Sequence, residues 1–239
     1  MLDWFLRHHR GGVKAIVLGM DRNWCDHAPA FTAAATPNPF PFWLYGAEPA
    51  NYLSGLFSFR SIEDSVRRLG VVIGRAPAAR RDGYNDFEAT RTYDAAAAAK
   101  RMPRRGPDDE GGAENAATKA AATPSAFDEQ RFLRLGALLR DLPATARIAV
   151  LFVPRYAETI PPAGSPAAAA IAFCKDRARA LAAADPRVRI VDFLRDDPVT
   201  RNAENFWDAI HYRGTVARLI EDRLAVAFAS PSPESDMAP

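Results

Sequence analysis

The chain has 239 residues, of which 48% are hydrophobic and 25% are charged, and its formal net charge is +2. This length suffices for one domain with a substantial core, and the composition is ordinary for a globular protein. Because 31 basic side chains nearly balance 29 acidic ones, the charge favours neither a nucleic-acid nor a membrane-surface partner. No stretch approaches the roughly 20 apolar residues of a membrane-spanning helix, and residues 1–10 lack the pattern of a signal peptide.

The first part of the chain predicts one buried strand among helices and a long loop. Residues 2–9 read as a helix that ends at Gly11-Gly12. Residues 13–19 are apolar and rich in β-branched side chains, which predicts a strand buried on both faces of a parallel sheet. Residues 21–47 follow neither a helix nor a strand period and carry many aromatics, so we expect a packed loop that forms a lid over the core.

The next segments predict a helix and then an insertion. A capping-box-like start at Ser61 and Asp64 predicts a helix over residues 61–69. Residues 95–124 open with five alanines and continue with Pro, Gly and charged residues. Such a stretch buries little apolar surface, so we expect a flexible insertion there.

The last part of the chain alternates helices with strands. Helices are predicted from Ser125 to Pro143, where leucines and Phe132 form a stripe at helical spacing, and from Ser165-Pro166 onward. Strands are predicted over residues 147–153 and 188–193, and a final apolar-faced helix over residues 216–228. Residues 230–239 are polar and rich in proline, which predicts a disordered tail after a single domain over residues 1–229.

This order of elements indicates an α/β domain with a parallel sheet. In open sheets of this kind, ligands bind beyond the carboxyl ends of the strands. Three predicted loops leave such ends, after Gly19, after Val153 and after Phe193. The third loop leads to Asp208 and His211, which makes these two residues the main candidates for chemistry.

Asp208 and His211 are three residues apart, and on a helical turn that spacing places their Cβ atoms about 5–6 Å apart. A carboxylate at that position accepts a hydrogen bond from one imidazole nitrogen and leaves the other nitrogen free to take a proton from a hydroxyl. The same spacing also fits a surface pair that caps the last helix. From the spacing alone the surface pair is the commoner arrangement.

The segment Phe-Trp-Asp-Ala-Ile-His-Tyr-Arg, which ends at Arg213, resembles the last conserved block of SGNH (GDSL-like) hydrolases. The resemblance implies a flavodoxin-like, three-layer parallel sheet, here incomplete at the N-terminus. It also implies that Asp208 and His211 complete a catalytic triad with a serine from the family's first block. In spacing, chain position and context the two residues match the family well.

The strand that ends at Gly19-Met20-Asp21 resembles the third strand of the same family, which closes on a Gly-x-Asn-Asp motif. There the Asn donates a hydrogen bond to the oxyanion, so the resemblance makes Gly19 and Asp21 oxyanion candidates. Asp21 takes the place of the Asn, and an ionised carboxylate cannot donate a hydrogen bond. The oxyanion role is therefore weaker here than the role of the Asp–His pair.

More narrowly, the chain is similar to SGNH-like proteins of bacterial envelopes that are related to alginate-acetylation proteins. These share a Val-Leu-Gly-Leu-Asp strand end, a Tyr-Leu-Leu-Ser stretch followed by Asp-Ser, and an Ala-Ser-His-Tyr-Arg ending. The counterparts here lie at residues 17–21, at residues 52–54 with 64–65, and at residues 209–213. The resemblance implies a location in the cell envelope or periplasm, and an acylated carbohydrate or small ester as the partner.

The nucleophile of that family is absent from the sequence. No Gly-Asp-Ser and no Gly-x-Ser-x-Gly occurs, and Ser54, Ser58, Ser61, Ser65 and Ser165 read as caps or surface hydroxyls. In the family, the serine-bearing first strand pairs with the third. We therefore expect that the sequence starts at an internal Met and that a longer protein carries both the serine and an N-terminal membrane anchor.

Two hypotheses of function follow. The first is the C-terminal part of an ester hydrolase or O-acyltransferase domain, inactive without an upstream serine block. The second is a non-catalytic binding or scaffold protein on a degenerate SGNH fold, favoured by the missing serine and by Asp21.

The two cysteines, Cys25 and Cys174, lie far apart in sequence. A single bridge between them and two free, partly buried thiols are both open, and free thiols are the commoner state for such a pair. Cys25, Asp26 and His27 are contiguous, which is poor spacing for metal ligands, and no second cluster completes a site. The sequence implies no metal and no organic cofactor.

Overall fold

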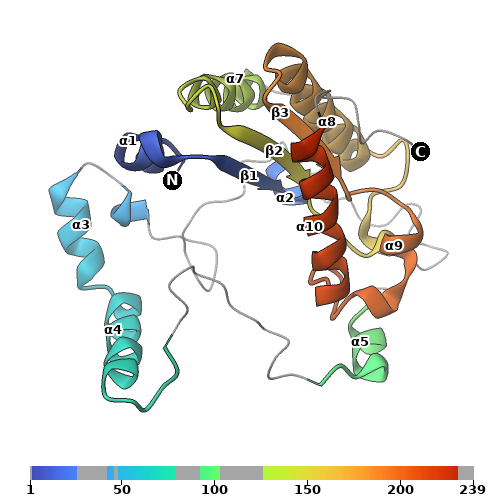
Figure 1. The fold of residues 1–239 in the computed structure, drawn as a ribbon. Coiled ribbons are helices and arrows are strands. Elements are labelled where there is room, and N and C mark those ends of the chain that lie inside the picture. Colours follow the sequence, from blue (N-terminus) through green and yellow to red (C-terminus); the bar gives the residue numbers. More distant parts are fainter. Residues whose placement is uncertain (1, 26–41, 46–47, 79–91, 103–125, 231–239) are drawn as a thin grey trace. The chain divides into compact units, whose positions relative to one another are not determined.

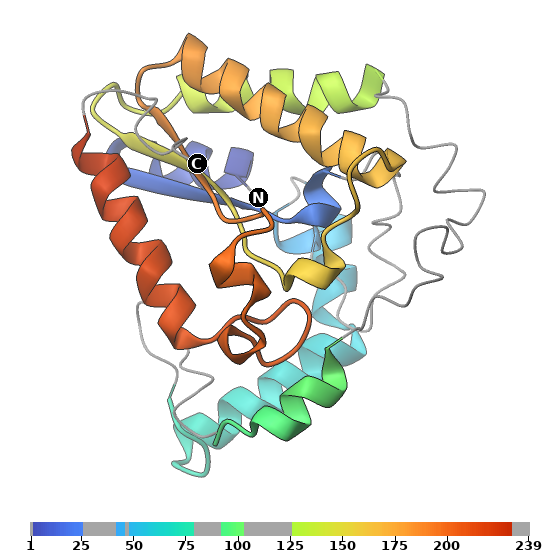
Figure 2. The same cartoon turned by 90° about the vertical axis from the view of Figure 1, so that its right-hand side faces the viewer.

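The computed structural model describes residues 2–25, 42–45, 48–78, 92–102 and 126–230 (Figures 1 and 2). The chain divides into two compact units, one of residues 1–8 and 31–91 and the other of residues 9–30 and 92–239. Most of the predicted lid loop, most of the predicted insertion and the tail after Ser230 lie outside the described residues. Among the helices that are described, none is both long and apolar enough to span a membrane.

The first unit is helical. It contains α1 (Leu2–His9), the 3-10 turn η3 (Phe42–Leu44), α3 (Pro49–Leu56) and α4 (Phe59–Val72). The predicted N-terminal helix is confirmed, and it ends in a further 3-10 turn, η1 (Arg10–Gly12). Trp43 packs so closely on α3 that a Cβ atom at Gly55 would lie 2.1 Å from its ring, so this approach requires glycine.

The predicted start of α4 was wrong by one helical turn. The N-cap is Ser58, whose hydroxyl accepts a hydrogen bond from the Ser61 amide at 3.2 Å, whereas Ser61 lies inside the helix and donates to the Gly55 carbonyl at 2.7 Å. Because two serines stand three residues apart, either can begin a helix by sequence. The apolar positions of the predicted helix, such as Ile62 and Val66, are exposed.

The second unit is built on a parallel sheet of three described strands in the order β1-β2-β3 (Figure 1). These are β1 (Ala15–Met20), β2 (Arg147–Phe152) and β3 (Val188–Asp192). In the register, Met20 lies opposite Phe152, and Phe152 lies opposite Asp192. The three predicted strands and the predicted α/β class are thus confirmed, and the carboxyl ends of all three strands meet at one edge.

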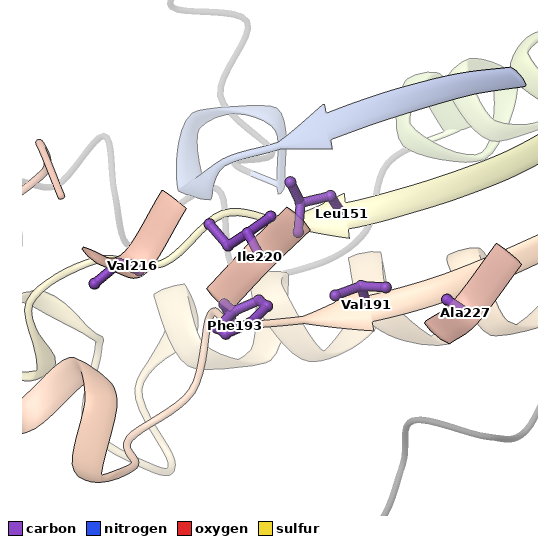
Figure 3. Packing of buried hydrophobic residues seen from close by; sticks show 6 residues of the cluster. All are labelled: Leu151, Val191, Phe193, Val216, Ile220 and Ala227. Carbon is purple, nitrogen blue, oxygen red and sulfur yellow. The ribbon is translucent and has the colours of Figure 1, made fainter. Parts of the chain in front are cut away.

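Helices cover the two faces of this sheet. α7 (Ala126–Arg140) and α8 (Pro166–Ala184) lie on one side and α10 (Gly214–Ala229) lies on the other (Figures 1 and 2). Ser165 caps α8 as predicted, accepting the amide of Ala168. Figure 3 shows the apolar cluster between α10 and the sheet, which consists of Leu151, Val191, Phe193, Val216, Ile220 and Ala227.

β1 is less covered than its sequence predicted. Its side chains alternate, so that Met20 is buried while Ala15, Val17 and Gly19 are exposed. The exposed positions share a face with Ala149 and Leu151 of β2, and α10 covers that face over β2 and β3. An apolar run predicts a strand but does not tell whether a helix covers each face, which is why burial on both faces was a wrong prediction.

The start of the predicted flexible insertion is ordered. Residues Ala95–Arg101 form the helix α5, whose N-cap Asp94 accepts the amides of Ala96 and Ala97. Ala98 is buried against the segment around the 3-10 turn η6 (Ala203–Asn205). Alanine has the highest helix propensity, so a capped run of alanines forms a helix when it can pack against a neighbouring segment.

The two cysteines form a disulfide, which corrects the preference for free thiols. Cys25 ends the short helix α2 (Arg22–Cys25), Cys174 lies in the middle of α8, and both are buried. A separation of 149 residues carries no information about distance in space. Packing of α2 on α8 brings the two sulfurs together and ties the loop after β1 to the helical layer.

Candidate functional site

The candidate site is the segment that follows β3, and its first part is held by side-chain caps. The Asp197 carboxylate accepts the amides of Val199 and Thr200, which starts the short helix α9 (Pro198–Arg201). The fully buried Thr200 hydroxyl donates to the Arg195 carbonyl at 2.6 Å. Such local hydrogen bonds fix a connection that has few backbone ladder contacts of its own.

The second part, residues 206–212, is a closed turn. Phe206 and Tyr212 form an antiparallel bridge, and the Trp207 amide donates to the His211 carbonyl at 2.8 Å. The Arg213 amide donates to the Asn205 carbonyl at 2.8 Å, which brings the two ends of the turn together. The Phe206 side chain is completely buried and anchors the turn in the core.

Asp208 and His211 lie inside this turn and contact each other. Nδ1 of His211 is 2.7 Å from Oδ2 and 2.9 Å from Oδ1 of Asp208. The amides of Ile210 and His211 each donate to Oδ1 at 2.9 Å. The predicted proximity of the carboxylate and the imidazole is thus present, and the geometry is that of a carboxylate that receives Nδ1–H.

The environment keeps the Asp208 carboxyl ionised. Partial burial alone would raise its pKa, but hydrogen bonds from the Ile210 amide, the His211 ring and the His211 amide outweigh burial and lower the pKa. The Asp208 side chain is 31% exposed and the His211 side chain 69% exposed. With Nδ1 occupied by Asp208, the second ring nitrogen is the one that can exchange protons with an incoming group.

The loop after β2 contacts this turn. The Tyr156 amide donates to the Ala209 carbonyl at 3.1 Å, and the Tyr156 ring lies edge-on to Phe206. At the neighbouring strand end, the Val153 amide donates to the Met20 carbonyl at 3.0 Å. The loops after β1, β2 and β3 therefore share one edge of the sheet, as the sequence predicted for a ligand site.

The two oxyanion candidates lie at this edge but are not equivalent. Asp21 follows β1, and its carboxylate accepts the Trp24 amide at 2.9 Å, which starts α2. Gly19 is exposed within β1, and a Cβ atom added there would meet no atom within 4 Å. Asp21 thus acts as a hydrogen-bond acceptor toward the Trp24 amide.

Five of the six described serines form structural hydrogen bonds, and the sixth, Ser54, is exposed on α3. Ser58 and Ser165 are helix caps, Ser61 donates to Gly55, Ser65 donates to the Ser61 carbonyl, and Ser230 donates to Val226. Within the described ranges, no serine forms a hydrogen bond with His211. Among the described residues, the hydrogen-bond partner of the His211 ring is therefore Asp208 and not a serine.

Sequence reasoning missed Arg22, Arg155 and Tyr156, which accompany the Asp–His turn at the sheet edge. Each of the three follows a strand end by two to four residues. That position in the chain was the signal that could have found them. As for metals, the described residues contain no group of three or more His, Cys, Asp and Glu side chains arranged to hold an ion.

The chain matches no protein-family model, no curated protein and no solved structure.

Proposed function

We propose that this chain is the Asp–His part of an SGNH-like ester hydrolase or O-acyltransferase domain, with His211 as general base and Asp208 as its orienting partner. The observation that carries the proposal is the 2.7 Å contact between Nδ1 of His211 and Oδ2 of Asp208. Its place after the last described strand, at the carboxyl edge of a parallel sheet, supports the same assignment.

In this proposal, Asp208 stays ionised and accepts Nδ1–H, so Nε2 of His211 takes the proton of a serine hydroxyl. The serine oxygen attacks the ester carbonyl, and the imidazolium returns the proton to the leaving alcohol as the acyl–oxygen bond breaks. Water or a second alcohol then takes the acyl group by the same proton transfers in reverse order. In this proposal the serine is supplied by sequence outside this chain. The substrate class is an acylated carbohydrate or a small ester.

The disulfide supports the envelope location that the resemblance implies. Disulfides persist mainly in oxidising compartments, such as the bacterial periplasm. Cys25 and Cys174 are both buried, as expected for a bridge that holds structure.

The test begins with the genomic frame upstream of Met1. If an in-frame Gly-Asp-Ser-like strand is encoded there, the protein that includes it should hydrolyse p-nitrophenyl acetate. His211→Ala should then reduce the rate by at least about a thousandfold, in line with the loss of a triad member. The exposed His9→Ala variant is the matched control and should keep full activity. A folded protein whose activity survives His211→Ala would contradict the proposal.

A second candidate is a non-catalytic binding or scaffold protein on the same fold. The observation that favours it is the use of Asp21 as a cap, because a carboxylate that accepts the Trp24 amide does not donate to an oxyanion. A stop codon immediately upstream of Met1, together with no ester hydrolysis by the chain, would support this candidate over the enzyme.

A further inference from the structure

Two arginines stand at the carboxyl ends of neighbouring strands. Arg22 begins α2, two residues after β1 ends at Met20, and Arg155 lies three residues after β2 ends at Phe152. Met20 and Phe152 are paired in the sheet, so the two arginines leave the same edge. The residue after Arg155 is Tyr156, whose amide contacts the turn that carries Asp208 and His211.

Within the part of the chain that the structure describes, no direct contact neutralises either arginine. Arg22 and Arg155 are both half-buried, and neither forms a hydrogen bond or an ion pair with any residue in the described ranges. The Nε atom of Arg155 is buried without a hydrogen-bond partner. In contrast, Arg187, Arg195 and Arg201 of the same unit each contact a carboxylate.

The charge of Arg22 also acts on the Arg155 guanidinium. Burial lowers the pKa of Arg155, the nearby charge of Arg22 lowers it further, and Asp21 opposes this effect only in part. Asp21 is a single carboxylate that also accepts the Trp24 amide. The formal charges of the two arginines and of Asp21 sum to +1.

Such an arrangement is costly in the absence of a ligand. Desolvated like charges repel, and a buried N–H donor without a partner loses its hydrogen bond to water. An oxyanion bound between the two guanidinium groups would offset the repulsion of the two positive charges and would accept a hydrogen bond from the unpaired N–H donor. The planar guanidinium fork matches the two oxygens of a carboxylate or phosphate in geometry as well as in charge.

We propose that Arg22 and Arg155 bind an oxyanion, either a carboxylate or a phosphate group, at the carboxyl ends of β1 and β2. The binding site itself does not depend on the hydrolase assignment. One consequence does rest on the proposed hydrolase function. If that function is correct, the ester acted on at His211 carries a negatively charged group, which is held one strand away from the reacting carbonyl.

The test measures binding of inorganic phosphate and of acetate to the whole chain by calorimetry and by thermal unfolding, at pH 7.5 and constant ionic strength set with chloride. The expected result is saturable binding of at least one of the two anions, and which one binds identifies the oxyanion. Arg155→Gln and Arg22→Gln should each weaken that binding at least about tenfold, since each removes a charge-assisted contact.

The matched control is Arg147→Gln, which removes the same charge from the opposite end of β2. It should leave the affinity within about twofold, because an exposed charge at the other edge contributes only a screened interaction. In the absence of anion, Arg155→Gln should unfold at the same or a higher temperature than the parent chain, since the repulsion is relieved. A purely structural Arg155 would instead lower that temperature.

Two results would overturn the inference. One is binding of neither anion above the chloride background, and the other is equal affinity in the parent chain and in Arg155→Gln. His211→Ala should keep the anion affinity, so a failure of the hydrolase proposal and a failure of this one are distinguishable. Lost ester hydrolysis with intact phosphate or acetate binding, for example, would leave the arginine site standing.

Discussion

Oδ1 of Asp208 accepts the Nδ1 contact of His211 at 2.9 Å and, at the same distance, the amides of Ile210 and His211. One carboxylate oxygen therefore both shapes the turn and orients the imidazole ring. This double role means that a change at Asp208 should alter the backbone of the turn as well as the chemistry of the histidine. The two effects separate in variants that keep or remove the acceptor oxygen.

Asp208→Ala should destabilise the chain by about 1–3 kcal/mol, because it leaves two amide donors and a ring nitrogen without their acceptor. Asp208→Asn keeps an oxygen acceptor and should cost less. Urea unfolding gives the free energies, and hydrogen exchange of the Ile210 and His211 amides gives the local effect. Unchanged protection of both amides in Asp208→Ala would contradict the role assigned to Oδ1.

Stability should fall in acid as the carboxylates of Asp185 and Asp208 become protonated. The hydrogen bond from Arg187 is the main cause that lowers the pKa of Asp185, and hydrogen bonds outweigh burial to lower the pKa of Asp208. A carboxyl whose pKa is lower in the folded state stabilises the fold above its unfolded pKa of 3.8 and loses that contribution as the pH falls through its folded value.

The comparison uses Asp185→Asn. The gap in unfolding free energy between the parent chain and this variant should be constant above about pH 5 and should shrink steadily below pH 3.8. Denaturant titrations at a series of pH values measure this gap. A gap that grows as the pH falls would contradict the assigned direction of the pKa shift.

Reduction of the Cys25–Cys174 disulfide should lower stability substantially. The bridge closes a loop with a sequence separation of 149 residues, and the chain-entropy description gives up to about 5 kcal/mol for loops of that length. The double variant Cys25→Ser, Cys174→Ser should unfold at a lower temperature than the oxidised chain. Reductant should lower the midpoint of the parent chain but not that of the double variant. Mass spectrometry that finds both thiols free in the purified chain would exclude the bridge.

Gly55→Ala should destabilise the first unit by about 1–3 kcal/mol, as expected when an added methyl group meets a packed ring. The new Cβ would lie 2.1 Å from the Trp43 side chain. Gly70→Ala is the control in the same unit, since its Cβ would meet only Ala76 at an ordinary 3.7 Å and would favour the helix. Urea unfolding followed by far-UV circular dichroism measures both effects, and equal effects would contradict the close approach.

Much of the fold was predictable because its elements depend on local signals. The apolar runs at residues 13–19, 147–153 and 188–193 predicted the three strands, and Ser165-Pro166 predicted the start of α8. These signals act within a few residues, through propensity, caps and apolar periodicity. The Asp208–His211 contact belongs to the same class, because both residues lie within one turn.

What the sequence did not predict depends on contacts between distant segments. The Cys25–Cys174 bridge requires that α2 packs on α8. The formation of helix α5 requires that Ala98 is buried against the segment around η6. Exposure of Val17 follows from how far α10 extends over the sheet. The placement of Arg22 and Arg155 at one edge of the sheet likewise arises from two adjacent strand ends that are far apart in the chain.

The most direct measurement of the central claim is the tautomer of His211 in the chain itself, assigned from ¹⁵N chemical shifts and long-range ring couplings at pH 8. If the Asp208 carboxylate orients the ring for general-base catalysis, Nδ1 carries the proton and Nε2 is unprotonated. Asp208→Ala should then lose this preference. A ring protonated mainly at Nε2, or one whose tautomer is the same with and without the Asp208 carboxylate, would contradict the account.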